Sequence, residues 1–139
     1  MIIAIDFDGT CVTHDYPRVG KDIGAATVLK ELVASGHQLM LWTMRGNKPL
    51  AGMPDTLQDA VDWFRNNDIP LWAVNENPDQ KKSGWSLSNK QYAELYIDDA
   101  ALGCPLLLNP FFSQRPFVNW EKVREYLVDN KIITTFEQK

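Results

Sequence analysis

The chain has little cysteine, no excess of positive charge and no long apolar run. Only Cys11 and Cys104 among its 139 residues are cysteine. Two thiols do not make a disulfide framework or a cysteine metal cluster, so we expect reduced thiols and a cytoplasmic protein. Cys11 directly follows an acidic motif, and we interpret it as a small buried hydrophobe rather than a reactive thiol.

The charge balance argues against binding to nucleic acid or an anionic membrane, and the short apolar runs argue against a transmembrane helix or a signal peptide. The formal net charge is -4, so the sequence has no basic footprint for nucleic acid or an anionic membrane. No apolar run approaches the length of a transmembrane helix, and the apolar residues 2–5 are too few for a signal peptide. With 45% hydrophobic residues and no repeat or linker, residues 1–139 are predicted to form a single domain.

Segments typical of strands and helices alternate along the chain. The predicted strands are residues 1–5, 37–43, 69–74, 93–97 and 105–108. The predicted helices are residues 25–33, ended by Ser35-Gly36, a helix beginning at the capping-box pattern 56–59, and 120–129, capped by Asn119. In the last helix, Val123, Tyr126 and Leu127 are expected to face inward. This alternation predicts an α/β fold, a three-layer Rossmann-like parallel sheet with helices on both faces.

The most informative stretch is Asp6-Phe7-Asp8-Gly9-Thr10, which directly follows the first predicted strand. Two carboxylates two residues apart at a strand's end can reach one cleft, and Gly9 permits a sharp turn. Acids at the end of a buried strand cost desolvation energy unless a cation is present. Mg²⁺ suits them, because it takes hard oxygen ligands and needs few from the protein.

Other polar residues follow the other predicted strands. Thr43 ends the second predicted strand, and Arg45 lies two residues further on. Asp98 and Asp99 end the fourth predicted strand, and Lys90 lies just upstream of that strand. Right-handed crossovers bring the carboxyl ends of parallel strands to one edge, where ligands bind. The chemistry suggested is phosphoryl transfer through an aspartyl phosphate, with a second carboxyl group as acid and base.

These motifs resemble those of the haloacid dehalogenase (HAD) superfamily of phosphohydrolases from residue 2 to about residue 108. The first motif is Asp6 to Thr10, the second is Leu41-Trp42-Thr43, the third is Lys90 and the fourth is Tyr96-Ile97-Asp98-Asp99. The resemblance implies a Mg²⁺-dependent phosphatase in which Asp6 is the nucleophile and a metal ligand. It also implies that Asp8 is the general acid and base, with its carbonyl on the metal. Asp98 and Asp99 would be further metal ligands, Lys90 a catalytic cation, and Thr43, Met44 and Arg45 substrate-binding residues.

Several of these assignments have alternatives. Thr43 is compatible with a plain strand residue, Asp99 with a helix cap, and Arg45 with either a substrate clamp or a surface role. Lys81 and Lys82 compete with Lys90 for the part of the active-site lysine.

The intervals beside the first motif are too short for a cap domain, so we expect a capless enzyme. Residues 14–21 and Trp85 are candidates for a partial lid, whereas the other tryptophans are expected in the core. An open site suits a phosphorylated small molecule, an exposed phosphoester, or a site completed by a second subunit in a homo-oligomer. One alternative is a signalling receiver domain, which would need a phosphoacceptor Asp on the third strand, whereas that strand ends Ala73-Val74-Asn75-Glu76. The other is a catalytically silent phosphate-binding domain.

Overall fold

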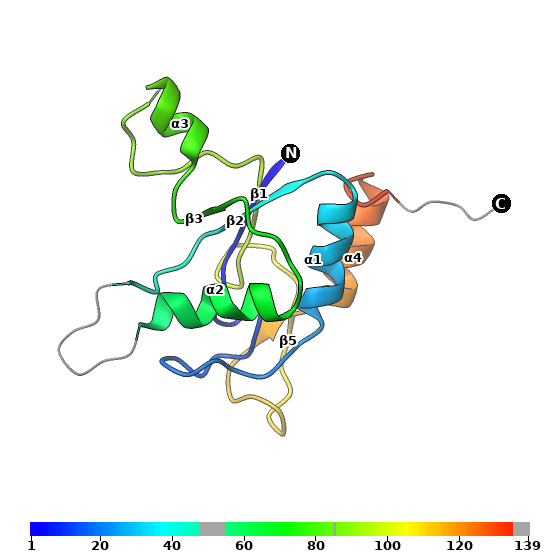
Figure 1. Cartoon of the computed structure of the whole chain (residues 1–139). Helices are drawn as coiled ribbons and strands as arrows, with labels where there is room; N and C mark the ends of the chain where they lie inside the picture. Colours follow the sequence, from blue (N-terminus) through cyan, green and yellow to red (C-terminus); the bar gives the residue numbers. More distant parts are fainter. Residues whose placement is uncertain (48–54, 85, 135–139) are drawn as a thin grey trace.

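The computed structural model of the chain describes residues 1–47, 55–84 and 86–134. Four parallel strands form the main sheet in the order β3-β2-β1-β4, and they are β1 (Ile2–Ile5), β2 (Gln38–Leu41), β3 (Ala73–Val74) and β4 (Leu95–Ile97). The helices are α1 (Ala25–Ala34), α2 (Thr56–Asn66), α3 (Pro78–Ser83) and α4 (Trp120–Asp129). A separate antiparallel pair consists of β5 (Leu106–Leu107) and β6 (Phe117–Val118). The predicted α/β class, with a parallel sheet flanked by helices, is confirmed (Figure 1).

The core lies mainly on one face of the sheet. Successive strand residues point to opposite faces, and Ile3 and Ile5 of β1 join a cluster that includes side chains from α1, α2 and α4. α1 and α4 lie side by side over this face (Figure 1). Tyr96 of β4 points to the other face, where its hydroxyl donates to the Gln91 carbonyl at 2.5 Å. Gln91, between α3 and β4, therefore contacts the second face.

The helix ends mostly lie where the local sequence predicts them, but the predicted cap of α2 and the predicted orientation of one α4 side chain were wrong. Gly36 has φ 90° after the end of α1, and the Asn119 side chain accepts from the Lys122 N–H at 3.2 Å, as predicted. The capping box at residues 56–59 was wrong: Asp55 is the N-cap, and it accepts from Gln58. Asp at that position satisfies a free N–H of the first turn. Tyr126 is also not inward-facing, because its side chain is 60% exposed.

The short strands differ more from expectation. β3 begins only at Ala73, because pairing with β2 starts where the Trp72 N–H donates to the Leu39 carbonyl. The predicted fifth strand exists as β5, but it pairs with β6 outside the main sheet. α3 lies inside the polar loop that follows β3.

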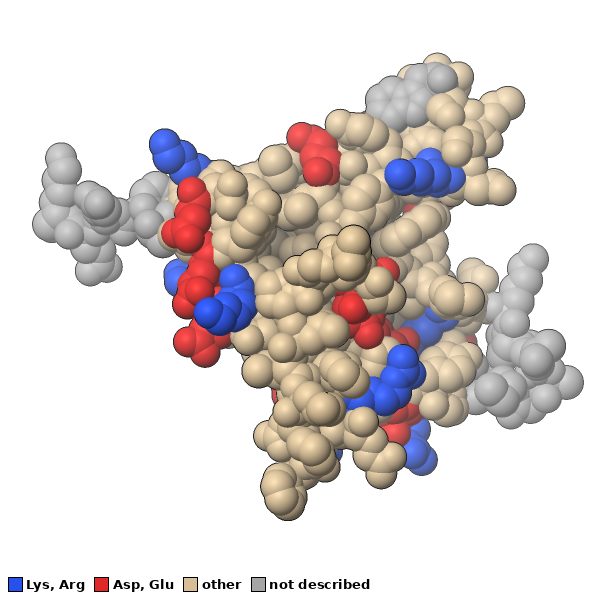
Figure 2. Space-filling model, turned by 180° about the vertical axis from the view of Figure 1, so that it is seen from behind, with Lys and Arg blue, Asp and Glu red and all other residues tan. Residues whose placement is uncertain are grey.

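The charge distribution on the surface and the character of the helices bear on possible contacts with a membrane. Acidic and basic side chains are interspersed on the face shown in Figure 2, so that face has no broad field of one sign. Within the described part of the chain, no helix has both the length and the apolar character needed to cross a membrane.

Candidate active site

Three carboxylates meet at the carboxyl edge of the main sheet. Asp6 follows β1, and its N–H donates to the Ile97 carbonyl at 3.0 Å. Asp98 and Asp99 follow β4, the neighbouring strand. One carboxylate oxygen from each of the three lies within 4.8 Å of the others. The predicted convergence of these acids is therefore what the fold produces.

This crowding changes the acidity of Asp6. Its pKa rises from 3.8 to about 7, mainly because burial disfavours the charged form. The negative charge of Asp98 and a hydrogen bond with Asp99 raise the pKa further, whereas the Thr10 hydroxyl, which donates to Asp6 Oδ2 at 2.7 Å, lowers it. The site therefore favours either a proton or a cation close to Asp6.

The loop that carries the motif is fixed from several sides. The buried Thr10 Oγ1 accepts the Asp99 N–H at 3.0 Å, and the Thr10 carbonyl accepts from Trp120 Nε1 at 2.6 Å. His14 Nε2 lies 2.7 Å from Asp99 Oδ2. Gly9 has φ +80°, and a Cβ there would overlap His14 and lie 2.6 Å from Asp99 Oδ2. The motif thus needs glycine both for its backbone conformation and for the close approach of this pair.

Sequence reasoning did not assign Thr10 or His14 to the site. Thr10 was visible as the last residue of the first motif. His14 was considered only as the first residue of the lid candidate 14–21, and its contact with Asp99 could not be predicted because the two residues are 85 positions apart. No helix begins directly after Asp99. The residues after it form a turn in which Asp98 Oδ1 accepts the Ala100 N–H at 2.9 Å, so the helix-cap alternative for Asp99 was wrong.

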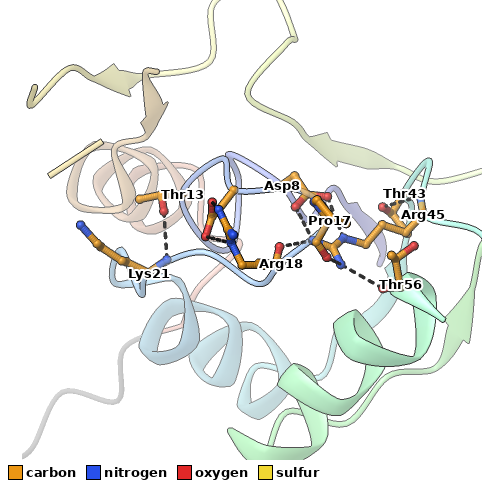
Figure 3. Close-up of polar contacts among 9 residues, drawn as sticks. Asp8, Thr13, Pro17, Arg18, Lys21, Thr43, Arg45 and Thr56 are labelled. Carbon is orange, nitrogen blue, oxygen red and sulfur yellow. Dashed lines mark hydrogen bonds and ion pairs between the residues drawn. The ribbon is translucent and has the colours of Figure 1, made fainter. Parts of the chain in front are cut away.

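Asp8 points to Arg45 rather than to the other acids. Arg45 Nη2 donates to Asp8 Oδ1 at 2.7 Å, and Nε donates to Oδ2 at 2.8 Å (Figure 3). The remaining guanidinium protons are donated to the carbonyls of Pro17, Arg18 and Thr56. Arg45 is 3% exposed, so the surface role considered for it was wrong. In this structure every guanidinium N–H is used, and Arg45 ties Asp8 to residues 17–18 and to the start of α2.

Thr43 and Met44 line a cavity of about 360 Å³ together with Asp6 and Asp98. The Thr43 N–H donates to Asn75 Oδ1 at 2.8 Å, which orients the turn after β2. Thr43 Oγ1 accepts the Arg45 N–H at 3.1 Å, so the hydroxyl proton remains available to a ligand. Asn75 also lines the cavity, and its position directly after β3 was the signal that could have identified it.

The predicted lysine lies apart from the acids. Lys90 Nζ is 5.8 Å from the centroid of the Tyr96 ring, and within the described residues it forms no ion pair. Lys81 instead pairs with Glu76 at 2.9 Å. Lys90 therefore stays a prediction as the active-site cation, and the lid candidate Trp85 lies outside the described residues.

The core assignments near the site agree with the structure in part. Cys11 is fully buried, and burial, followed by the charges of Asp6 and Asp8, raises the pKa of its thiol. Trp63 and Trp120 are buried as expected, whereas Trp42 and Trp72 are only partly buried and lie outside the core cluster.

Comparison with known proteins identifies a similar structure but no activity. No protein-family model matches the chain, and no curated protein matches it. Among solved structures, a conserved protein coded by a locus from Bacteroides thetaiotaomicron is 32% identical, with a TM-score of 0.69. The similarity covers 98% of this chain and 93% of that one.

Proposed function

The chain belongs to the same family as the conserved Bacteroides thetaiotaomicron protein, and from its site we propose a magnesium-dependent phosphohydrolase of the HAD superfamily, without a cap domain. The observation that carries the proposal is the meeting of Asp6, Asp98 and Asp99 at the carboxyl edge of the parallel sheet. Asp8 stands two residues after Asp6, the position at which the resemblance places the acid that moves a proton.

The donor set fits Mg²⁺. Three carboxylate oxygens within 4.8 Å of one another are hard ligands, and burial, together with the charge of Asp98, raises the pKa of Asp6, so a cation there would stabilise its ionised form. Asp6, Asp98 and Asp99 would hold the ion, with the Asp8 carbonyl as a further ligand implied by the resemblance. When bound, Mg²⁺ supplies positive charge that lets the Asp6 carboxylate approach an anionic phosphoryl group.

In the proposed reaction, the Asp6 carboxylate attacks phosphorus and the bond from phosphorus to the alcohol oxygen breaks. Asp8 gives a proton to that departing oxygen, so the alcohol leaves neutral. Water then attacks the phosphoryl group, Asp8 takes a proton from the water, and phosphate leaves with Asp6 restored as a carboxylate. Arg45 uses one lone pair on each Asp8 oxygen, and each oxygen keeps another for proton transfer.

Two other residues have supporting parts in the proposal. The free hydroxyl proton of Thr43 would donate to the phosphoryl oxygens in the 360 Å³ cavity. Lys90 would neutralise the phosphoryl group, which requires its side chain to leave the Tyr96 ring.

The test is hydrolysis of p-nitrophenyl phosphate and a panel of phosphorylated metabolites with Mg²⁺. We expect Asp6→Asn to lower kcat by about a thousandfold or more, because it removes the nucleophile. The matched control is Asp129→Asn, an exposed acid at the end of α4, which should retain activity. If folded wild type performs no better than Asp6→Asn across a metal and pH series, the phosphatase proposal fails.

One observation favours a second candidate, a catalytically silent phosphate-binding domain. Both carboxylate oxygens of Asp8 are engaged by the buried Arg45. In a silent domain this pair would be purely structural. Phosphate would then bind with Mg²⁺, measurable by calorimetry, while no substrate of the panel turned over.

A further inference from the structure

A second cavity, of about 650 Å³, lies beside the aspartate cluster. One wall comes from residues 13–21, after the opening motif, and the other from residues 110–115, between β5 and β6. His14 lines this cavity, and its Nε2 lies 2.7 Å from Asp99 Oδ2. His14 therefore contacts both this cavity and an acid of the proposed metal site.

Lys21 is held in place where the two walls meet. Its Nζ donates to the Phe112 carbonyl at 2.9 Å and lies 4.8 Å from the centroid of the Phe112 ring. Its backbone N–H donates to Thr13 Oγ1 at 2.9 Å, a contact drawn in Figure 3. An ammonium has three protons and one is used, so two remain for a ligand.

The unpaired charge of the lining is positive. Arg115 is an exposed second cation, and its guanidinium forms no ion pair within the described residues. Asp15 is the acid of the lining, but Arg18 donates to both of its oxygens, at 3.0 and 3.2 Å. Those hydrogen bonds lower the pKa of Asp15, which keeps it ionised and paired. An incoming anion therefore meets Lys21 and Arg115 rather than a free carboxylate.

We propose that this cavity binds a second anionic group, a carboxylate or a phosphate, on the alcohol part of the substrate. The proposal rests on the proposed phosphohydrolase function and narrows its substrate class. With the phosphoryl group at Asp6, the carbon chain passes His14 and the second anion lies between Lys21 and Arg115. The volume suits a chain of sugar length, since pockets for small ligands span about 300–1,000 Å³.

The test compares three substrates with the same open carbon chain. Glucitol 6-phosphate has a neutral far end, 6-phosphogluconate has a carboxylate there, and glucitol 1,6-bisphosphate has a phosphate. With Mg²⁺ we expect KM about tenfold lower for one or both of the doubly anionic substrates, the factor expected for two partly solvated ionic contacts. The preferred end group identifies carboxylate or phosphate as the natural ligand.

Two double variants separate the cavity from overall charge. Lys21→Gln with Arg115→Gln should bring the KM values together. Lys30→Gln with Lys122→Gln removes the same charge from exposed lysines outside the cavity lining and should retain the preference. Equal KM values in wild type, or a preference that survives the cavity variant, would overturn the proposal.

Binding to the Asp6→Asn protein distinguishes this proposal from the one on which it rests. Calorimetry with 6-phosphogluconate and glucitol 6-phosphate needs no turnover. Binding that favours the anionic end and depends on Lys21 and Arg115, without hydrolysis by wild type, would sink the enzyme proposal and leave the anion site standing. Hydrolysis by wild type without any preference for the anionic end would support the enzyme proposal and overturn the anion site.

Discussion

Replacing Asp6 with Asn should make the metal-free protein more stable above pH 7, although it removes the proposed nucleophile. Burial, with the charge of Asp98, raises the pKa of Asp6 from 3.8 to about 7. A difference of about 3 units at about 1.4 kcal/mol each sets a ceiling of about 4 kcal/mol. Because the side chain is partly exposed, we expect a gain of about 1–3 kcal/mol after solvent screening. Asn keeps an oxygen that can accept the Thr10 hydrogen bond.

The sign of the pH dependence follows from the raised pKa. Below about pH 4, Asp6 is protonated in both the folded and the unfolded chain, so it costs no stability. Between about pH 4 and pH 7 the unfolded chain ionises while the folded chain stays protonated, and the cost grows. Above about pH 7 the cost is complete. The advantage of Asp6→Asn should therefore appear across this range and then level off.

Urea denaturation in EDTA, at steps from pH 4 to pH 8.5, measures this free energy of unfolding. Asp129→Asn is the control and should change stability by less than about 0.5 kcal/mol at every pH. Adding Mg²⁺ at pH 8.5 should stabilise wild type more than Asp6→Asn, because a ligand stabilises the state that binds it. An Asp6→Asn variant no more stable than wild type at pH 8.5, or an advantage independent of pH, would refute the reasoning.

Three further changes test the surroundings of the site. Arg45→Met leaves the Asp8 carboxylate and three carbonyls without their donor. We therefore expect the free energy of unfolding, measured by urea denaturation, to fall by about 3–5 kcal/mol and to be partly restored in Arg45→Lys. Wild-type stability in the Met variant would contradict this. Gly9→Ala places a Cβ against His14 at φ +80° and should cost about 1–3 kcal/mol, read from thermal denaturation, and an unchanged melting temperature would contradict this. Cys11 is buried and its thiol pKa is raised. In a variant whose other cysteine is replaced by alanine, Ellman's reagent should therefore label Cys11 only after the protein is unfolded. Rapid labelling of the folded protein would disprove its burial.

Predictions based on local patterns were accurate where one short segment contains the whole signal. α4 begins and ends as predicted, because the apolar spacing and the Asn119 cap are both local. The meeting of Asp6 with Asp98 was also predictable, since the carboxyl ends of adjacent parallel strands share an edge. Tyr126 was misplaced because helical spacing defines a stripe, but packing decides how far round the helix burial extends.

By itself the sequence determined the α/β class, the edge at which the acids gather and the chemistry that they suggest. These follow from strand alternation and chain direction, which are properties of the backbone. Only the tertiary structure decided that Arg45 is buried on Asp8, that His14 contacts Asp99 and that Lys21 spans a second cavity to Phe112. Those contacts join residues 37, 85 and 91 positions apart, and which loops fold over the sheet edge depends on the packing of the whole chain rather than on any local pattern.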